Sequence, residues 1–136
     1  MKAPIAVLGC GALVAVGAVP AVAAAPKSGQ YSGSRHDVVL LVTGRSIDLA
    51  AFSFRCGSES GRASLNSVRI RKRDGVYRFS IRTHATVSFP DRNRPDENAA
   101  VRFRGRFARS GNSVRGRFRV SSRHCNTGSV RWSARR

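Results

Sequence analysis

AAVRFRGRFARSGNSVRGRFRVS, residues 99–121, is the stretch that decides the fold of this chain. Arginines occupy alternate positions on both sides of the Gly111-Asn112 pair, and apolar residues or glycines lie between them. A period of two residues is typical of a β-strand with one buried and one exposed face. Two such runs joined by a short glycine-containing segment predict a β-hairpin with an arginine-rich outer face.

The turn decides which residues face one another across this hairpin. A two-residue turn at Gly111-Asn112, with glycine first, suits a tight hairpin and would place each phenylalanine ring opposite a glycine. This register pairs Arg104 with Arg119, Arg106 with Arg117, Gly105 with Phe118, and Phe107 with Gly116.

A turn at Ser110-Gly111 is the alternative. Arginine faces arginine in either register, and directly opposed like charges destabilise a sheet by some tenths of a kcal/mol per pair. A face built in this way indicates that the hairpin meets an anion. The alternative register pairs Arg102 with Arg119, Arg104 with Arg117, and Arg106 with Arg115.

Residues 1–25 are predicted to be a secretory signal peptide. Lys2 supplies the positive start, and Ile5 to Ala18 is an apolar run without a charge. The small residues Val22-Ala23-Ala24 or Ala23-Ala24-Ala25 offer a cleavage site, so cleavage is located to within about two residues. We therefore expect a protein that is secreted or associated with the cell envelope, with no transmembrane segment after cleavage.

A retained membrane anchor and a lipoprotein are the alternatives for this segment. Gly9, Gly11, Gly17 and Pro20 interrupt the apolar run and disfavour an anchor. About five apolar residues precede Cys10, fewer than the ~7 expected before a processed cysteine, which disfavours a lipoprotein.

The remaining chain of about 110 residues suffices for one domain and is too short for two. We expect a short tether at 26–30 and one domain at 31–136. Arginine outnumbers lysine 22 to 3, and without Lys2 the charge is about +17, because 24 basic residues face 7 acidic ones. A high-GC genome explains arginine in place of lysine but not the excess of positive charge, which attracts polyanions.

Cys56 and Cys125 are expected to form a disulfide in an oxidising compartment. The bond would close a loop of about 70 residues and stabilise the fold by about 4 kcal/mol. A metal site formed by both cysteines with His124 and His36 is the alternative. The adjacent pair His124-Cys125 would point to opposite faces of a strand, which disfavours such a site.

Short strands separated by turn residues follow the tether, with no helical periodicity. Two polar segments, Cys56–Asn66 and Pro90–Asn98, are predicted to be loops. Eight such strands predict an all-β fold, an antiparallel eight-stranded barrel or a barrel-like sandwich made mostly of meander hairpins. The predicted strands are 31–33, 36–43, 46–55, 67–73, 76–89, the two arms of 99–121, and 128–135.

Asp74-Gly75 predicts a second hairpin between 67–73 and 76–89. Its register opposes Arg71 to Arg78, so the charge arrangement of the first hairpin recurs. The same register extended along the strands pairs Ile70 with Phe79 and Val68 with Ile81.

The segment Val38-Val39-Leu40-Leu41-Val42 is apolar on both faces. A strand of this kind is normally covered on both faces. The second cover could be a loop, a chain terminus or a partner subunit, and the sequence does not choose among them or set the oligomeric state.

Three features together resemble a group of small exported proteins of high-GC bacteria that have no assigned activity. They are the Tyr31-Ser32-Gly33 opening, a cysteine after the third strand, and the closing run from Cys125 to Arg135. The resemblance implies a β-rich domain with one disulfide and no catalytic residue. The aromatic-x-Gly opening is also similar to that of lipocalins and avidins, with Tyr31 in place of their tryptophan.

No motif establishes catalysis, a metal or a cofactor. Gly57-Ser58-Glu59-Ser60-Gly61 resembles a nucleophile elbow, but its central residue is glutamate. A secreted hydrolase or nuclease needs a histidine near a carboxylate or nucleophile, and nothing in the sequence brings His36, His84 or His124 to one. We therefore expect a non-catalytic protein, with the hydrolase or nuclease as an alternative.

The aromatic residues alternate with the arginines, so they belong to the opposite, inward face and form the core. An internal cavity lined by them would favour a second alternative, a small-ligand-binding barrel, although an eight-stranded barrel can be filled by side chains. These residues are Phe52, Phe54, Tyr77, Phe79, Phe103, Phe107, Phe118 and Trp132.

An arginine-rich sheet face is the candidate functional surface. Guanidinium groups bind phosphate, sulfate or carboxylate in bidentate fashion, so the expected partner is an anionic polymer or anionic envelope surface, bound without specific nucleic-acid readout. Such binding is salt-dependent, and an ordinary solvated surface is the competing interpretation. The candidate residues are Arg69, Arg71, Arg78, Arg82, Arg102, Arg104, Arg106, Arg115, Arg117 and Arg119.

Overall fold

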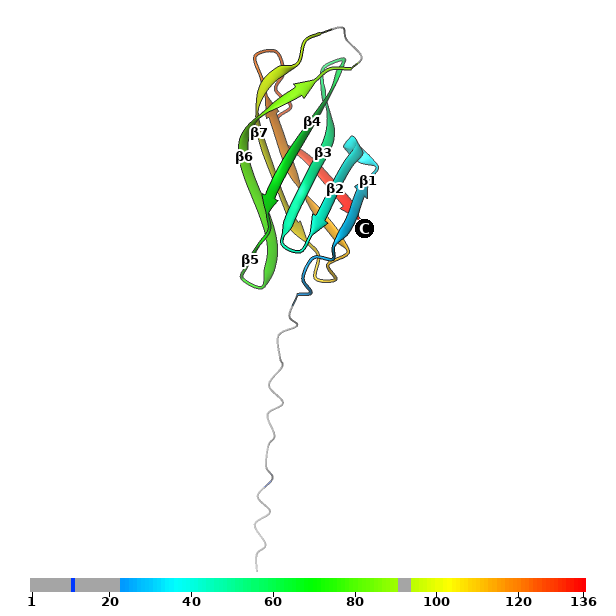
Figure 1. The fold of residues 1–136 in the computed structure, drawn as a ribbon, viewed down its shortest axis with the longest axis vertical. Helices are drawn as coiled ribbons and strands as arrows, with labels where there is room; N and C mark the ends of the chain where they lie inside the picture. Colours follow the sequence, from blue (N-terminus) through cyan, green and yellow to red (C-terminus); the bar gives the residue numbers. More distant parts are fainter. Residues whose placement is uncertain (1–10, 12–22, 91–93) are drawn as a thin grey trace, which may run out of the picture.

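The computed structural model describes Gly11, residues 23–90 and residues 94–136, so the predicted signal peptide lies almost entirely outside the described residues. Eight antiparallel strands close a barrel in meander order, and a ninth short strand, β5, extends one hairpin (Figure 1). Pairing between β4 and β6 closes the sheet. The predicted all-β antiparallel class is confirmed, as a barrel.

The strands differ in length, and one 3-10 turn, η1 (Arg35–Asp37), separates the first two. The longest strands, β3, β4, β6 and β7, form most of the barrel wall. In chain order the strands are β1 (Gly29–Gly33), β2 (Val38–Thr43), β3 (Ser46–Cys56), β4 (Glu59–Arg69), β5 (Arg71–Arg73), β6 (Val76–Ser88), β7 (Glu97–Phe107), β8 (Ser113–Ser121) and β9 (Val130–Arg135).

The prediction of a loop over Cys56–Asn66 was wrong, because β4 begins at Glu59. Its inward residues Gly61 and Ala63 are small, so the sequence reads as a loop. They are small because they lie opposite the large rings of Phe54 and Phe52. A Cβ atom on Gly61 would collide with the Phe54 ring.

The expected strand 67–73 divides at Ile70. The hairpin at Asp74-Gly75 forms with Arg71 opposite Arg78, as predicted. The extended register was wrong, because Val68 pairs with Ile47 of β3 instead of with Ile81. The Ile70 N–H donates to the Arg45 carbonyl at 2.8 Å, so the chain stays beside the start of β3 as far as Ile70, and β5 pairs with β6 only from Arg71.

The β7–β8 hairpin adopts the second of the two registers considered. Phe107 pairs with Val114 and Gly105 with Gly116, so the predicted Gly111-Asn112 turn and its phenylalanine–glycine pairs were wrong. The Gly111 N–H donates to the Ala108 carbonyl, and Gly111 takes the left-handed conformation with φ of 73°. Gly111 is therefore the last residue of a four-residue turn that begins at Ala108, and not the first central residue of a two-residue turn.

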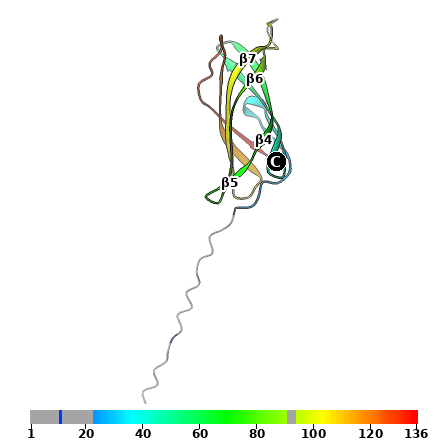
Figure 2. The same cartoon turned by 60° about the vertical axis from the view of Figure 1, so that its left-hand side comes forward.

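The strands wrap around a single interior, seen from a second side in Figure 2. Buried aromatic rings occupy this interior. Phe103 is fully buried and stacks on Trp132, with ring centroids 4.8 Å apart, and on Phe52 at 5.2 Å. Phe52 also contacts Phe118 at 4.5 Å. All eight predicted core aromatics are buried, and Tyr31 and Phe89 join them.

Gly105 and Gly116 lie where there is no room for a Cβ atom. A Cβ on Gly105 would collide with the Phe79 ring and come within 3.0 Å of Trp132. A Cβ on Gly116 would overlap the Arg104 carbonyl oxygen of the neighbouring strand. Neither position can therefore hold a side chain, and the backbone of both glycines lines the groove between the arginines.

The disulfide between Cys56 and Cys125 is present, with Cα atoms 5.5 Å apart. It joins the end of β3 to the loop between β8 and β9 at one end of the barrel. The predicted strand start at His36 was wrong: His36 and Asp37 lie in η1 with positive φ, and β2 begins at Val38. The His36 ring packs edge-on against Phe118, 5.4 Å between centroids, and covers part of the core.

The tether is attached to the barrel at the opposite end. Pro26 is buried, and the Lys27 N–H donates to the Gly111 carbonyl at 3.2 Å. The Tyr31 hydroxyl lies 2.7 Å from the Lys27 carbonyl and 2.6 Å from that of Gly111 and donates to one of them. Burial raises the pKa of Tyr31 above its usual value. The chain leading into β1 is therefore part of the packed structure.

The outward apolar face of residues 38–42 is small. Val39 pairs with Ala51 and Leu41 with Leu49, which makes a patch of four apolar side chains on the outer wall. Leu41 is 38% exposed, so within the described residues neither a loop nor a terminus covers it.

Candidate anion-binding face

Three pairs of arginines face one another across β7 and β8, and we call them the arginine ladder. Antiparallel pairing places opposed Cα atoms ~4.5–5.5 Å apart and successive pairs ~6.8 Å apart along the strands. Each pair projects outward because Phe103, Phe107, Val114 and Phe118, which alternate with the arginines, are buried in the core. The three rungs are Arg102 with Arg119, Arg104 with Arg117, and Arg106 with Arg115.

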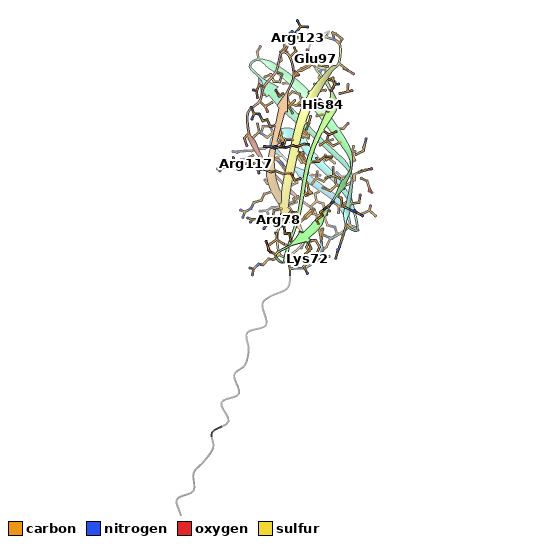
Figure 3. The ribbon with its side chains drawn as sticks, turned by 90° about the vertical axis from the view of Figure 1, so that its left-hand side faces the viewer. Lys72, Arg78, His84, Glu97, Arg117 and Arg123 are labelled. Atoms are coloured by element: carbon orange, nitrogen blue, oxygen red, sulfur yellow. A yellow bond between two sulfur atoms is a disulfide. The ribbon has the colours of Figure 1, made fainter. Side chains whose placement is uncertain are left out.

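Neighbouring strands add a third arginine to every rung. On β6, Arg78 pairs with Arg106 and Arg82 with Arg102; on β9, Arg131 pairs with Arg117. Arg71 of β5 extends the first row by pairing with Arg78. The ladder with these four residues is the arginine face. Figure 3 looks onto this side of the barrel, where Arg117 and Arg78 project outward.

The arginine face is hollowed by shallow grooves. One groove of about 820 Å³ lies at the lower rungs and is lined by eight arginines together with the backbone of Gly105 and Gly116. A second, of about 410 Å³, lies at the upper rung beside Arg82. All ten arginines predicted from the sequence line one or both of these grooves: Arg69, Arg71, Arg78, Arg82, Arg102, Arg104, Arg106, Arg115, Arg117 and Arg119.

Positive charge is concentrated on this side of the barrel. Strands β5–β9 contain 12 arginines and one carboxylate, Glu97, whereas β1–β4 contain 3 arginines. The salt bridges of the described residues involve Arg94 and His124 and none of the face. Arg117 makes one long hydrogen bond, to Ser129 at 3.4 Å. The guanidinium groups of the face are therefore available to an external anion.

Sequence reasoning missed two members of this region. Arg73 lines the larger groove, and Arg131 flanks the middle rung. Arg131 alternates with the inward residues Val130 and Trp132, so its outward position could have been predicted. Its place beside Arg117 depends on strand order, which the sequence does not give.

A histidine–carboxylate pair lies at the far end of β7, where Figure 3 labels Glu97. Glu97 accepts a hydrogen bond from the Ser122 hydroxyl at 2.9 Å, and its other oxygen lies 2.9 Å from His124 Nδ1. Arg94 bridges Glu97 and Glu59. These five residues, which we call the end clasp, join the loop regions that follow β3, β6 and β8.

The end clasp has the geometry of a structural cluster. Both Glu97 oxygens are occupied, His124 is about half exposed, and the grooves described above contain neither residue. The hydrogen bond from Ser122 is the largest cause that lowers the pKa of Glu97, and His124 and Arg94 lower it further. The carboxylate is thus held in its charged form as a bridging acceptor.

Glu97→Gln is expected to remove part of the acid sensitivity of the fold. A carboxylate whose pKa is lower in the folded state than in the unfolded state stabilises the fold at any pH above its unfolded-state pKa, ~4.3 for glutamate. This stabilisation is lost as the pH falls through the folded-state pKa. Thermal melting should therefore show the variant less stable than the parent at neutral pH, with the difference shrinking below about pH 4. Equal differences at pH 7 and pH 3 would contradict a role for the charge.

The metal alternative was wrong for the cysteines, because Cys56 and Cys125 are bonded to each other. In residues 23–90 and 94–136, no group of three or more potential ligands gathers as a metal site. No helix in the described part of the chain is long and apolar enough to cross a bilayer.

The chain matches no protein-family model, no curated protein and no solved structure. The resemblance to small exported one-disulfide proteins therefore stays a prediction.

Proposed function

We propose that this protein is an exported, non-catalytic binding module that holds an anionic polymer or an anionic envelope surface on its arginine face. The observation that carries the proposal is the arginine ladder, three directly opposed arginine pairs in succession with a third arginine beside each. The extracytoplasmic location is supported by the disulfide and by the predicted signal sequence.

The ladder is unfavourable to the protein alone. Opposed like charges destabilise a sheet, and solvent and salt screen this repulsion only in part. A bound polyanion converts the repulsion into bidentate, charge-assisted hydrogen bonds. The uneven distribution of arginine around the barrel also supports a localised surface over a uniform bias in composition.

Arg104→Glu with Arg117→Glu is expected to weaken polyanion binding at least ~100-fold, since each charge-assisted hydrogen bond contributes ~1.5–3 kcal/mol. Arg55→Glu with Arg123→Glu makes the same change in net charge away from the face and is the control. Fluorescence anisotropy with a labelled polyanion measures both, with circular dichroism to verify folding. Equal loss in the two variants would mean that only the net charge matters.

The partner class is tested with a panel of heparin-like glycan, teichoic acid, single- and double-stranded nucleic acid, and anionic vesicles. All are expected to bind at low salt, because counterion release drives every such contact. We expect one class of polyanion to stay bound at physiological salt. Release of all of them together would indicate an ordinary solvated surface.

A further inference from the structure

The ladder has a defined repeat along the strand direction. Arg102, Arg104 and Arg106 succeed one another on β7 at intervals of two residues, and their β8 partners do the same in the opposite direction. Two residues correspond to six backbone bonds and ~6.8 Å. The three rungs therefore form three equivalent anion positions in a line.

A phosphodiester polymer with three carbon atoms between phosphates has the same repeat. Its path from one phosphorus to the next crosses six bonds, and an extended chain covers ~3.3–3.6 Å for every three bonds, so phosphates lie ~7 Å apart. Such a chain parallel to β7 places one phosphate at each rung. A five-carbon linkage adds two bonds and would drift ~2 Å per repeat out of step with the rungs.

The groups between the arginines suit a polyol. Ser80 lies beside Arg104 and Ser133 beside Arg115, and Ser129 contacts Arg117. Their short hydroxyls can donate to and accept from the hydroxyls of a polyol unit.

The same face offers no stacking surface for a base. The aromatic rings of these strands point into the core, where Phe79, Phe103, Phe118 and Trp132 are at most 3% exposed. Proteins that hold single-stranded nucleic acid combine a basic groove with exposed aromatic rings. Although a nucleic-acid strand shares the six-bond repeat, its bases would find no ring to stack on here.

We infer that the ligand of the arginine face is a linear polyol-phosphate polymer with phosphates six bonds apart, bound with its axis parallel to β7 and β8 and one phosphate per rung. This inference rests on the proposed function. The charge of the face requires only an anionic polymer, and the inference further specifies the spacing of the phosphates and a ligand without bases.

The test is a competition experiment with the full chain at physiological salt. An end-labelled poly(glycerol phosphate) of about ten repeats is displaced by unlabelled poly(glycerol phosphate), 1,5-linked poly(ribitol phosphate), inorganic polyphosphate or oligothymidylate at equal phosphate number. The six-bond polyol polymer is expected to compete at least ~10-fold better than each of the others, since only it keeps all three phosphate contacts without adding bases. Equal competition by all four, or better competition by oligothymidylate, would overturn the inference.

Arg104→Gln with Arg117→Gln removes the middle rung, and Arg55→Gln with Arg123→Gln is the charge-matched control. The middle-rung variant should lose the preference for the six-bond polymer, and the control should keep it. If other polyanions bind through Arg104 and Arg117 without regard to spacing, the inference fails and the proposed function stands. If no polyanion binds at physiological salt, both fail.

Discussion

Phe103→Ala is expected to lower the free energy of unfolding by about 3–5 kcal/mol, the range found for buried phenylalanine replaced by alanine. Phe103 is fully buried, and its ring contacts Phe52, Phe79 and Trp132 at centroid distances of 5.2, 5.6 and 4.8 Å. Its removal leaves a cavity among these rings at the centre of the barrel. Since small domains are stable by ~5–15 kcal/mol, the loss is a large share of the total. Urea unfolding followed by tryptophan fluorescence measures it.

Leu41→Ala is the matched control for this prediction. Leu41 is also a large apolar residue on a strand, but it lies on the outer wall and is 38% exposed. Surface substitutions usually change stability by less than about 0.5 kcal/mol. A loss below about 1 kcal/mol for Phe103→Ala, or equal losses in the two variants, would mean that the aromatic stack is not the centre of the core.

Replacing both Cys56 and Cys125 by serine is expected to lower the free energy of unfolding by about 4 kcal/mol in the chain-entropy model. The bond joins residues 69 positions apart and ties the β8–β9 loop to the end of β3. The unfolded chain without it gains the entropy of an open loop of that length. Urea unfolding of the oxidised parent and the double variant gives the difference.

Two controls separate the bond from the side chains. Reduction of the parent under the same conditions should reproduce the loss, and Cys56→Ser alone should expose one free thiol at Cys125 to a thiol reagent. Free thiols at both Cys56 and Cys125 in the oxidised, folded parent would contradict the disulfide.

The fold class could be predicted because apolar and polar residues alternate clearly along the strands that contribute aromatic rings to the core. Residues 76–89 and 99–121 alternate between inward residues, most of them large and apolar, and outward polar residues, and both segments form strands of the barrel. Residues 59–64 alternate too, but their buried residues Gly61 and Ala63 are small because the rings of Phe54 and Phe52 on β3 occupy the space. A pattern that depends on the partner strand cannot be recognised from one strand alone.

The residues of the candidate face could be predicted from the sequence, but their pairing across the strands could not. All ten arginines lie where the outward parity placed them, yet the order of pairs depended on a turn for which the sequence offered two positions. Tertiary hydrogen bonds to the Gly111 carbonyl, from Lys27 and in part from Tyr31, fix that turn in the folded chain. Those contacts come from a segment about 80 residues away, so the sequence around the turn could not predict them.

The most direct test of the arginine face is chemical footprinting of arginine, with an arginine-selective dicarbonyl reagent and mass spectrometry, in the absence and presence of a bound polyanion. We expect protection of the ladder and its neighbours, strongest at Arg104, Arg106, Arg115 and Arg117, while Arg55 and Arg123 react as in the free protein. Protection spread evenly over the arginines, or centred on Arg55 and Arg123, would show that the arginine face is not the site that binds the polyanion.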